Sequence, residues 1–170
     1  MTLARLNALD KAAAREALER CCGSKRWVQS MCAARPFRDR DALNTAAGRA
    51  FGALEPEDWL EAFAYHPRIG DLAWLRDKYG STAAWAAEEQ RGAAAANQDT
   101  LEALAEANRA YEERFGYIFI VCATGKSAEE MLALLMDRMP HPPSLEIMVA
   151  AKEQMKITGL RIDKLLESPS

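Results

Sequence analysis

The sequence predicts an all-α protein: a single-domain bundle of roughly eight helices with one buried extended connection at about 117–124. Aromatic residues make up only 8% of the chain while alanine is abundant, which favours closely packed helices over a sandwich or a barrel. Apolar residues recur at helical spacing between capping residues and glycine or proline stops. Because 170 residues can bury a continuous core, we expect residues 1–170 to form one domain.

Four helices are expected in the first 66 residues, each opened by a residue type that caps or starts helices. The opening residues are Asp10, Ser24, Asp39 or Asp41, and Pro56. The first helix is expected to run to about Cys22 and to stop at Gly23. The fourth is expected to end at His66 and to bury its large apolar residues, which are Trp59, Leu60 and Phe63.

Capping residues and helix stops also recur in the second half of the chain. Ser81 can cap a helix through STAAWAAEEQRGAAAA, and Ser127 with Glu130 forms a capping box ahead of MLALLMDRM. A long helix between them is closed by Gly116, and its expected stripe is Leu101, Leu104, Asn108, Tyr111 and Phe115. A last helix starts near Ser144, and its expected apolar stripe is Leu145, Met148, Val149, Met155, Ile162 and Leu165 or Leu166.

One segment, YIFIVCAT at 117–124, departs from the helical pattern. Taken alone, this β-branched and aromatic run is typical of a buried strand. No second strand is evident to pair with it, and an isolated strand leaves its backbone groups unsatisfied. We therefore expect an extended or irregular buried connection, whose backbone groups can bind a polar ligand.

Composition excludes several classes of function. A net charge of −3 and the lack of a basic run argue against nucleic-acid binding. No apolar stretch approaches the ~20 residues that a membrane span needs. The chain shows no secretory signal, so its cysteines indicate a reduced, cytoplasmic protein in which all four are expected to be buried. These are Cys21, Cys22, Cys32 and Cys122, and none forms a C-x-x-C.

The stretch AYHPRIGD, residues 64–71, places His66 directly before Pro67. Proline disfavours helix at the preceding residue and Gly70 permits a tight turn, so a helix should stop here. An imidazole can donate or accept a proton near neutral pH, which makes His66 a candidate acid. On position alone, a histidine that interacts with the negative helix end is the commoner explanation. The charged turn that contains Arg68 and Asp71 favours a catalytic role for His66.

Two further features are candidates for chemistry. Glu88 and Glu89 are neighbours on an expected helix, so only one of them faces inward easily, and spacing does not decide which. Arg161, in the last helix, offers a planar guanidinium suited to a carboxylate or a ureido carbonyl. The alternative for Arg161 is an ordinary surface arginine paired with Asp163 or Glu167.

His141 lies in the proline-rich stretch MPHPPS and is expected to be a solvated loop residue. The chain has two histidines, and no third ligand stands at metal-like spacing from either of them. The sequence therefore predicts no metal site.

Six motifs together resemble one family: CCGSKRW, ARPF, DWLEAFAYHPRIGD, the W-x-x-x-EQ of WAAEEQ, FGYIFIVCATGKS and KITGLRIDKLL. They are spread along nearly the whole chain, and HPRIGD followed by EQ and FGYIFIVCATGK is far more specific than a lone short motif. On these motifs the sequence closely resembles 2-oxo-4-hydroxy-4-carboxy-5-ureidoimidazoline (OHCU) decarboxylase, the third enzyme of urate breakdown to (S)-allantoin.

The resemblance implies a lyase of purine metabolism: an all-helical, cytoplasmic homodimer that decarboxylates the small molecule OHCU without a metal or organic cofactor. It implies that His66 is the catalytic proton donor and that Glu89, rather than Glu88, is the second essential group. The arginine of the last helix in that family corresponds to Arg161. The implied substrate-binding positions are Pro67, Ala86, Gln90, Phe119, Ile120, Val121, Cys122 and Ala123.

The chain departs from the family pattern at Ala86, where a serine is common three residues before the essential glutamate. A hydroxyl contact to the substrate is therefore missing or replaced by water. Ala86 is also the one feature that favours an alternative, a non-catalytic helical binding or dimerisation module on the same scaffold. A second alternative is a decarboxylase of a related ureido acid.

Overall fold

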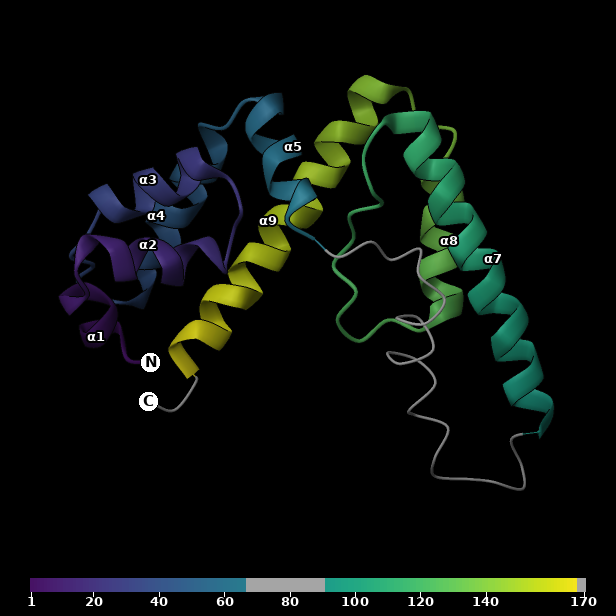
Figure 1. The fold of residues 1–170 in the computed structure, drawn as a ribbon, viewed down its shortest axis with the longest axis horizontal. Coiled ribbons are helices and arrows are strands. Elements are labelled where there is room, and N and C mark those ends of the chain that lie inside the picture. The colour runs from purple at the N-terminus through teal and green to yellow at the C-terminus, as the bar shows by residue number, and fades with distance from the viewer. Residues whose placement is uncertain (67–90, 168–170) are drawn as a thin grey trace. The chain divides into compact units, whose positions relative to one another are not determined.

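The structure, a computed structural model of the chain, describes residues 1–66 and 91–167, and for residues 91–97 it describes only the helical backbone. Within those ranges all regular structure is helical, in eight helices, which confirms the all-α prediction (Figure 1). The chain divides into two compact units. Unit 1 comprises residues 1–66, 120–122 and 147–170, and unit 2 comprises residues 67–119 and 123–146.

Unit 1 contains five short helices and most of one long helix. They are α1 (Leu3–Ala8), α2 (Lys11–Glu19), α3 (Lys25–Ala33), α4 (Arg40–Gly52), α5 (Pro56–Ala64) and α9 (Pro143–Glu167). The expected N-caps are confirmed, because Asp10, Ser24 and Asp39 each accept a hydrogen bond from a backbone N–H in the first turn. Helix α1 was not expected, and α2 ends three residues before Cys22.

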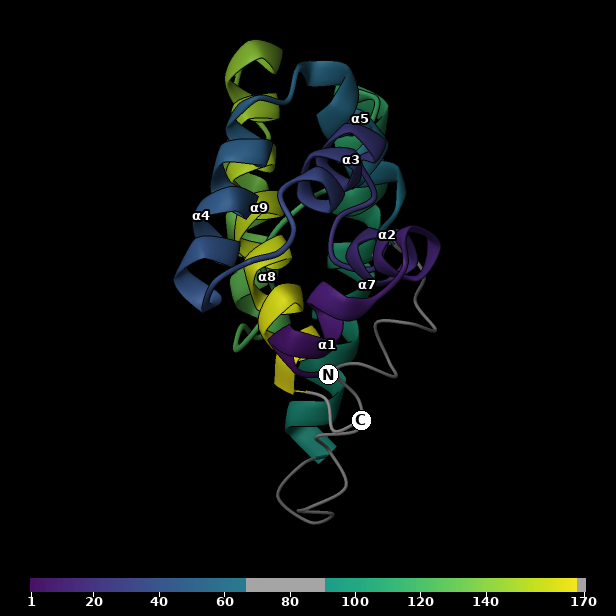
Figure 2. The ribbon, with the colours of Figure 1, turned by 90° about the vertical axis from the view of Figure 1, so that its left-hand side faces the viewer.

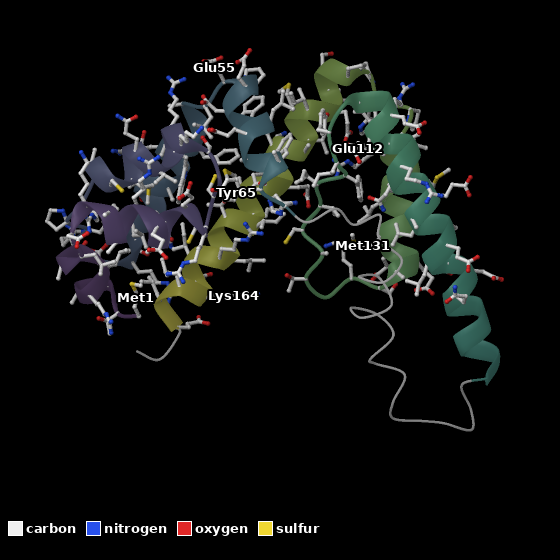
Figure 3. All side chains as sticks on the ribbon, viewed as in Figure 1. Met1, Glu55, Tyr65, Glu112, Met131 and Lys164 are labelled. Atoms are coloured by element: carbon white, nitrogen blue, oxygen red, sulfur yellow. The ribbon has the colours of Figure 1, made fainter. Side chains whose placement is uncertain are left out.

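The core of unit 1 centres on Trp27, which is fully buried and donates from Nε1 to the Ala47 carbonyl at 3.1 Å. That bond ties α3 to α4. Figure 2 shows α4 beside α9, and an ion pair between Arg40 and Asp163 at 2.6 Å joins the two helices. The amino group of Met1 donates to the Leu165 carbonyl at 2.6 Å, at the end of α9 near Lys164 (Figure 3). Thus Met1 and α4 are both anchored to α9, whereas α2, α4 and α5 pack against α3.

Four burial expectations need correction. Leu60 is 39% exposed and Trp59 is only half-buried, because the buried face of α5 is made by Ala62 and Phe63. Of the four cysteines, Cys21 and Cys22 are buried, whereas Cys32 and Cys122 are partly exposed. Burial raises the pKa of Cys21 to about 11, so this thiol stays protonated near neutral pH.

The apolar stripe expected on α9 was largely wrong. Three of its members are exposed, namely Leu145, Met148 and Met155, while Ile162 is buried as expected. The buried face consists instead of small residues and polar residues: Glu146, Ala150, Ala151, Gln154, Thr158 and Ile162. Hydrophobic periodicity misses such a face because polar side chains count as solvent-facing unless their hydrogen-bond partners are known.

Unit 2 contains α7 (Arg91–Phe115) and α8 (Ala128–Arg138), which pack side by side (Figure 1). The expected stripe of α7 is confirmed at four buried positions, Leu101, Leu104, Asn108 and Tyr111. Gly116 ends the helix at φ +80°, a left-handed conformation that glycine adopts readily. The capping box of Ser127 and Glu130 is also confirmed. Residues 91–96, assigned above to the preceding helix, belong to α7, and the segment capped by Ser81 lies largely outside the described residues.

A buried ionic cluster lies in unit 2 at the first turn of α9. Glu146 is completely buried and accepts hydrogen bonds from Tyr111, from the Arg138 guanidinium and from Nδ1 of His141, the last at 2.7 Å. The sequence predicted that His141 is a solvated loop residue, and this prediction was wrong. Burial, followed by the bond to Glu146, raises the pKa of Tyr111, so its hydroxyl remains a donor.

Residues 117–124, between α7 and α8, form neither helix nor strand, which confirms the extended connection. Phe119, Ile120 and Val121 are buried within it. Among the described residues, none of the helices combines the length and the apolar character that crossing a membrane requires.

Candidate active site

His66 lies just beyond the C-terminus of α5. The helix ends at Ala64, Tyr65 is its C-cap (labelled in Figure 3), and the His66 N–H still donates to the Phe63 carbonyl at 3.1 Å. The last turn of α5 therefore fixes the backbone of His66. This is the helix-end position that the sequence predicted from Pro67, which itself lies outside the described residues.

The His66 side chain contacts two residues of α9 within unit 1. Its Nε2 lies 2.6 Å from Oε1 of Gln154, and its Nδ1 lies 3.3 Å from Nη2 of Arg161. Arg161 is 95 residues away in sequence, so the pair depends entirely on tertiary packing.

The surface partners considered for Arg161 are engaged elsewhere. Asp163 lies 2.6 Å from Arg40 Nη2, and Glu167 lies 3.7 Å from the same atom. The structure thus brings together His66 and Arg161, two of the three residues assigned catalytic roles.

The electrostatic environment of His66 favours the neutral imidazole in the free protein. Burial lowers its pKa, the positive charge of Arg161 lowers it further, and the hydrogen bond with Gln154 acts in the opposite direction. The negative end of a helix ordinarily favours the imidazolium of a histidine beside it. Burial and the guanidinium outweigh that contribution here.

Helix α9 also orients the extended connection. The backbone N–H of Cys122 donates to Oε2 of Glu153 at 2.8 Å, and Glu153 precedes Gln154. Two adjacent residues of α9 therefore bind two parts of the expected site: the segment Ile120–Cys122 and the imidazole of His66. All of these residues belong to unit 1.

The two ends of the predicted substrate-binding segment belong to unit 2. Phe119 is buried there, with its ring centroid 5.1 Å from that of Tyr111 and 4.6 Å from the Arg138 guanidinium. Ala123 is partly exposed. The four remaining predicted site residues lie outside the described residues; they are Pro67, Ala86, Glu89 and Gln90.

Sequence reasoning missed three polar residues on α9, namely Glu153, Gln154 and Thr158. The usable signal was spacing, because Ala150, Gln154, Thr158 and Ile162 follow one another at four-residue intervals on one helix face. A polar residue enclosed in that way by small and apolar neighbours indicates a buried hydrogen bond.

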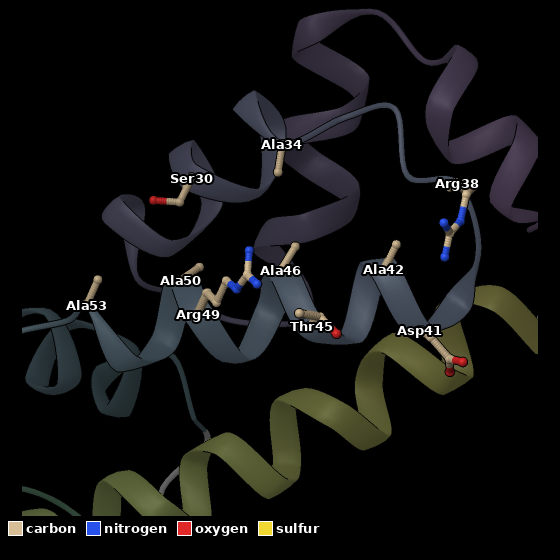
Figure 4. A pocket seen from close by; sticks show the side chains of 10 residues that line it. All are labelled: Ser30, Ala34, Arg38, Asp41, Ala42, Thr45, Ala46, Arg49, Ala50 and Ala53. Carbon is tan, nitrogen blue, oxygen red and sulfur yellow. The ribbon is translucent and has the colours of Figure 1, made fainter.

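Other features of the described residues do not compete with this site. Residues 1–66 and 98–167 contain no cluster of three or more His, Cys, Asp or Glu side chains that could bind a metal ion. A groove of about 580 Å³ between α3 and α4 is lined mainly by alanines, with Arg38 and Arg49 among its lining residues (Figure 4). None of the predicted site residues lines it.

Comparison with known proteins identifies the family. The family model described as OHCU decarboxylase matches residues 7–163, which is nearly the whole chain. The chain belongs to the OHCU decarboxylase family. A solved structure described as OHCU decarboxylase in the presence of (S)-allantoin is 37% identical, with a TM-score of 0.69, covering 88% of this chain and 96% of that one.

Curated relatives in the OHCU decarboxylase family agree with this placement. A bifunctional uric acid degradation protein of Arabidopsis thaliana is 38% identical over 145 residues, covering 85% of this chain but only 45% of the plant protein. The decarboxylase of Amia calva is 30% identical and covers 80% of this chain and 77% of its own length. The decarboxylase of Haloferax volcanii is 27% identical over almost the full length of both chains, 99% and 98%.

Proposed function

We propose that this chain decarboxylates OHCU to (S)-allantoin in urate breakdown, as a carboxy-lyase without a metal or organic cofactor, with His66 as the proton donor. The observation that carries the proposal is the pairing of His66 with Arg161 at 3.3 Å in a chain of this family. An imidazole beside a guanidinium offers a proton donor and a carboxylate anchor in one place.

The reaction needs no cofactor because the substrate contains its own electron acceptor. When the bond to the carboxylate breaks, carbon dioxide leaves and the electron pair moves into the C=N and carbonyl system of the ring. One proton then adds to the neighbouring carbon, which bears the ureido group, and the hydroxyl of the carbon that lost the carboxylate passes its proton to the ring nitrogen and becomes the carbonyl of allantoin. The protein has to orient the carboxylate, stabilise the developing charge and deliver that proton to one face.

Arg161 supplies the anchor and His66 the proton. The guanidinium presents a planar pair of donors that matches a carboxylate. An anionic substrate beside Nδ1 of His66 offsets the effects of burial and of Arg161 on the imidazole pKa, and so favours the imidazolium when substrate is bound. A single positioned acid protonates one face, whereas water would protonate both.

The family resemblance supplies the remaining roles. We propose Glu89 as the second essential group, with Pro67 and Gln90 lining the site. The backbone of residues 119–123 is proposed to bind the polar groups of the substrate, which fits the hydrogen bond that fixes Cys122 on α9. At Ala86 the substrate lacks a hydroxyl partner from the protein.

The test is to add the protein to urate undergoing oxidation and hydrolysis and to follow optical rotation. We expect (S)-allantoin to accumulate well above the spontaneous rate and without the racemic product of uncatalysed decay. Racemic allantoin formed at the spontaneous rate, by protein shown to be folded, would contradict the proposal and favour the non-catalytic module.

The paired glutamates test the role carried over from the family. Glu89→Gln should reduce kcat by roughly 10²-fold or more, the usual scale for an essential acid or base, while Glu88→Gln has little effect. Each variant is the matched control of the other. Equal losses in the two variants would exclude the assignment of Glu89.

We also propose that residues 1–170 act as one domain in a cytoplasmic homodimer. One domain fits a unit 1 that is assembled from three separate stretches of sequence. A reducing compartment fits four cysteines that form no disulfide bond, and self-association fits the exposed apolar side chains of Met148 and Met155 on α9. Sedimentation of the pure protein tests the dimer, and a Met148→Lys variant that stays dimeric would place the interface elsewhere.

A further inference from the structure

Two buried polar residues of α9 have no role in the proposed chemistry so far. Gln154 is completely buried and Thr158, one turn later, is 3% exposed. Buried amides and hydroxyls are retained where they form hydrogen bonds, so the partners of these two side chains define what they do.

Thr158 fixes which way the Gln154 amide points. The Thr158 hydroxyl donates to the main-chain carbonyl of Gln154 at 2.9 Å, so its oxygen lone pairs are free to accept. The Gln154 amide nitrogen lies 3.3 Å from that oxygen and donates to it. The other end of the amide, Oε1, therefore faces His66.

The same geometry assigns the proton on His66. An amide oxygen can only accept, so the Nε2 atom of His66, 2.6 Å away, has to carry a hydrogen. A guanidinium can only donate, so Nδ1, 3.3 Å from Nη2 of Arg161, has to present its lone pair. Both contacts select the same neutral tautomer, with hydrogen on Nε2.

We propose that Gln154 and Thr158 are positioning residues that keep a hydrogen on Nε2 of His66 and so make Nδ1 the nitrogen that gives its proton to the substrate. The inference rests on the proposed function for its last step, since it names the atom through which His66 acts. A neutral amide suits this task, because its oxygen accepts from Nε2–H equally in the imidazole and in the imidazolium. A carboxylate at the same place would favour the charged form.

The location of Nδ1 fits the role. It is the ring nitrogen that faces Arg161, the residue proposed to bind the substrate carboxylate. The atom that receives the proton is then next to the atom from which carbon dioxide departs. After transfer, Nδ1 again presents a lone pair to Arg161, and the next proton enters from solvent with the imidazole still oriented by Gln154.

The direct test is the nitrogen NMR spectrum of the imidazoles in the substrate-free protein. The chain has two histidines, so the signals missing from His66→Asn identify His66. We expect a protonated, pyrrole-type Nε2 and an unprotonated, pyridine-type Nδ1. The reverse pattern would overturn the inference. Because no substrate is present, this result is independent of whether the chain decarboxylates OHCU.

Variants test the catalytic consequence. Gln154→Met removes the acceptor at similar size, and we expect kcat to fall ~10–100-fold, since small misplacements of a catalytic group have that cost, with a smaller change in KM. Gln154→Glu should shift the pH at which the His66 signals titrate upward. Unaltered kcat in Gln154→Met and an unmoved titration in Gln154→Glu would each contradict the inference.

Thr158 offers a matched pair. Thr158→Val removes the hydroxyl at constant shape and frees the Gln154 amide to turn, so we expect kcat to fall and the NMR spectrum to show both tautomers. Thr158→Ser keeps the hydroxyl and should recover most of the activity that valine loses. Equal behaviour of the two variants would show that Thr158 only fills space. If Gln154→Met fails to fold, this pair of variants still tests whether Gln154 and Thr158 position His66.

Discussion

The two histidines of the chain occupy opposite kinds of environment. In unit 2, His141 contacts a carboxylate, Glu146, that is also bound by Arg138 and Tyr111. In unit 1, His66 contacts a neutral amide, Gln154, on one nitrogen and faces a cation on the other. Both clusters use residues of α9, so one helix contributes to both environments.

The difference fits a structural role for His141 and the chemical role proposed for His66. Four hydrogen bonds satisfy both oxygens of Glu146, and the charges around it compensate one another in a fully buried cluster. Burial and the bond to Glu146 raise the pKa of Tyr111, so its hydroxyl stays protonated as part of this cluster. The amide that contacts His66 fixes the direction of the imidazole while leaving its charge free to change. A proton donor needs that freedom.

The largest expected effect on stability comes from the Glu146 cluster. Glu146→Gln removes the charge that compensates the buried Arg138 guanidinium, and should lower the free energy of unfolding by ~3–5 kcal/mol. Glu129→Gln, at an exposed position in the first turn of α8, is the control and should cost at most ~1 kcal/mol. Urea unfolding measures both. Similar losses in the two variants would mean that the buried cluster is not a structural anchor.

A comparable effect, on catalysis instead of stability, is expected at Arg161. Lysine cannot reproduce the two-pronged contact, so Arg161→Lys should lose about 2–5 kcal/mol of transition-state binding, measured as kcat/KM. Arg49→Lys, in the groove between α3 and α4, is the matched control and should leave kcat/KM unchanged (Figure 4). Steady-state constants of Arg161→Lys equal to those of the wild type would return Arg161 to a surface role.

A smaller effect is expected in the pH dependence of stability. The pKa of His66 is lowered from its ordinary value of 6.5 in the folded protein, so the unfolded chain binds more protons just below that pH. Stability should therefore decline as the pH falls below about 6.5, with a slope of at most ~1.4 kcal/mol per pH unit from this group. Arg161 is the charged group that sets this shift together with burial. The His66→Asn variant should lack this part of the slope, and an identical slope would contradict the environment described for His66.

No effect is expected from metal removal. The chain has two histidines, and the sequence contains no cluster of cysteine and histidine residues at metal-ligand spacing. Extended treatment with a chelator should therefore leave turnover unchanged. Activity that is lost with the chelator and restored by zinc would show that the reaction depends on more than the residues described.

The local features of the fold could be predicted from the sequence. Asp10, Ser24, Asp39 and the capping box of Ser127 start helices because a side-chain oxygen binds a nearby N–H, which depends on a few adjacent residues alone. The end of α5 at Ala64, shortly before His66, follows from Pro67 in the same way. The buried connection at 117–124 could be inferred from the lack of a partner strand.

The partners of the polar face of α9 could not be predicted. The four-residue spacing of Gln154 and Thr158 indicates burial, but His66, which contacts Gln154, lies 88 residues earlier, and no local pattern contains that information. Hydrophobic spacing selected Met148 and Met155 instead, which are exposed. The family resemblance assigned His66 and Arg161 to one site, but their contact could come only from the structure, since a contact across 95 residues is a property of the tertiary fold.

The most direct test of the account is to measure turnover and stability of two matched variants, His66→Asn and His141→Asn. We predict that His66→Asn folds normally and loses ~10²–10⁴-fold in kcat together with the preference for (S)-allantoin. We predict that His141→Asn unfolds more easily, by ~1.5–3 kcal/mol for a lost hydrogen bond to a charged group, and retains its kcat when folded. Near wild-type turnover in His66→Asn, or an equal loss of kcat in both variants, would contradict the division of roles between the two histidines.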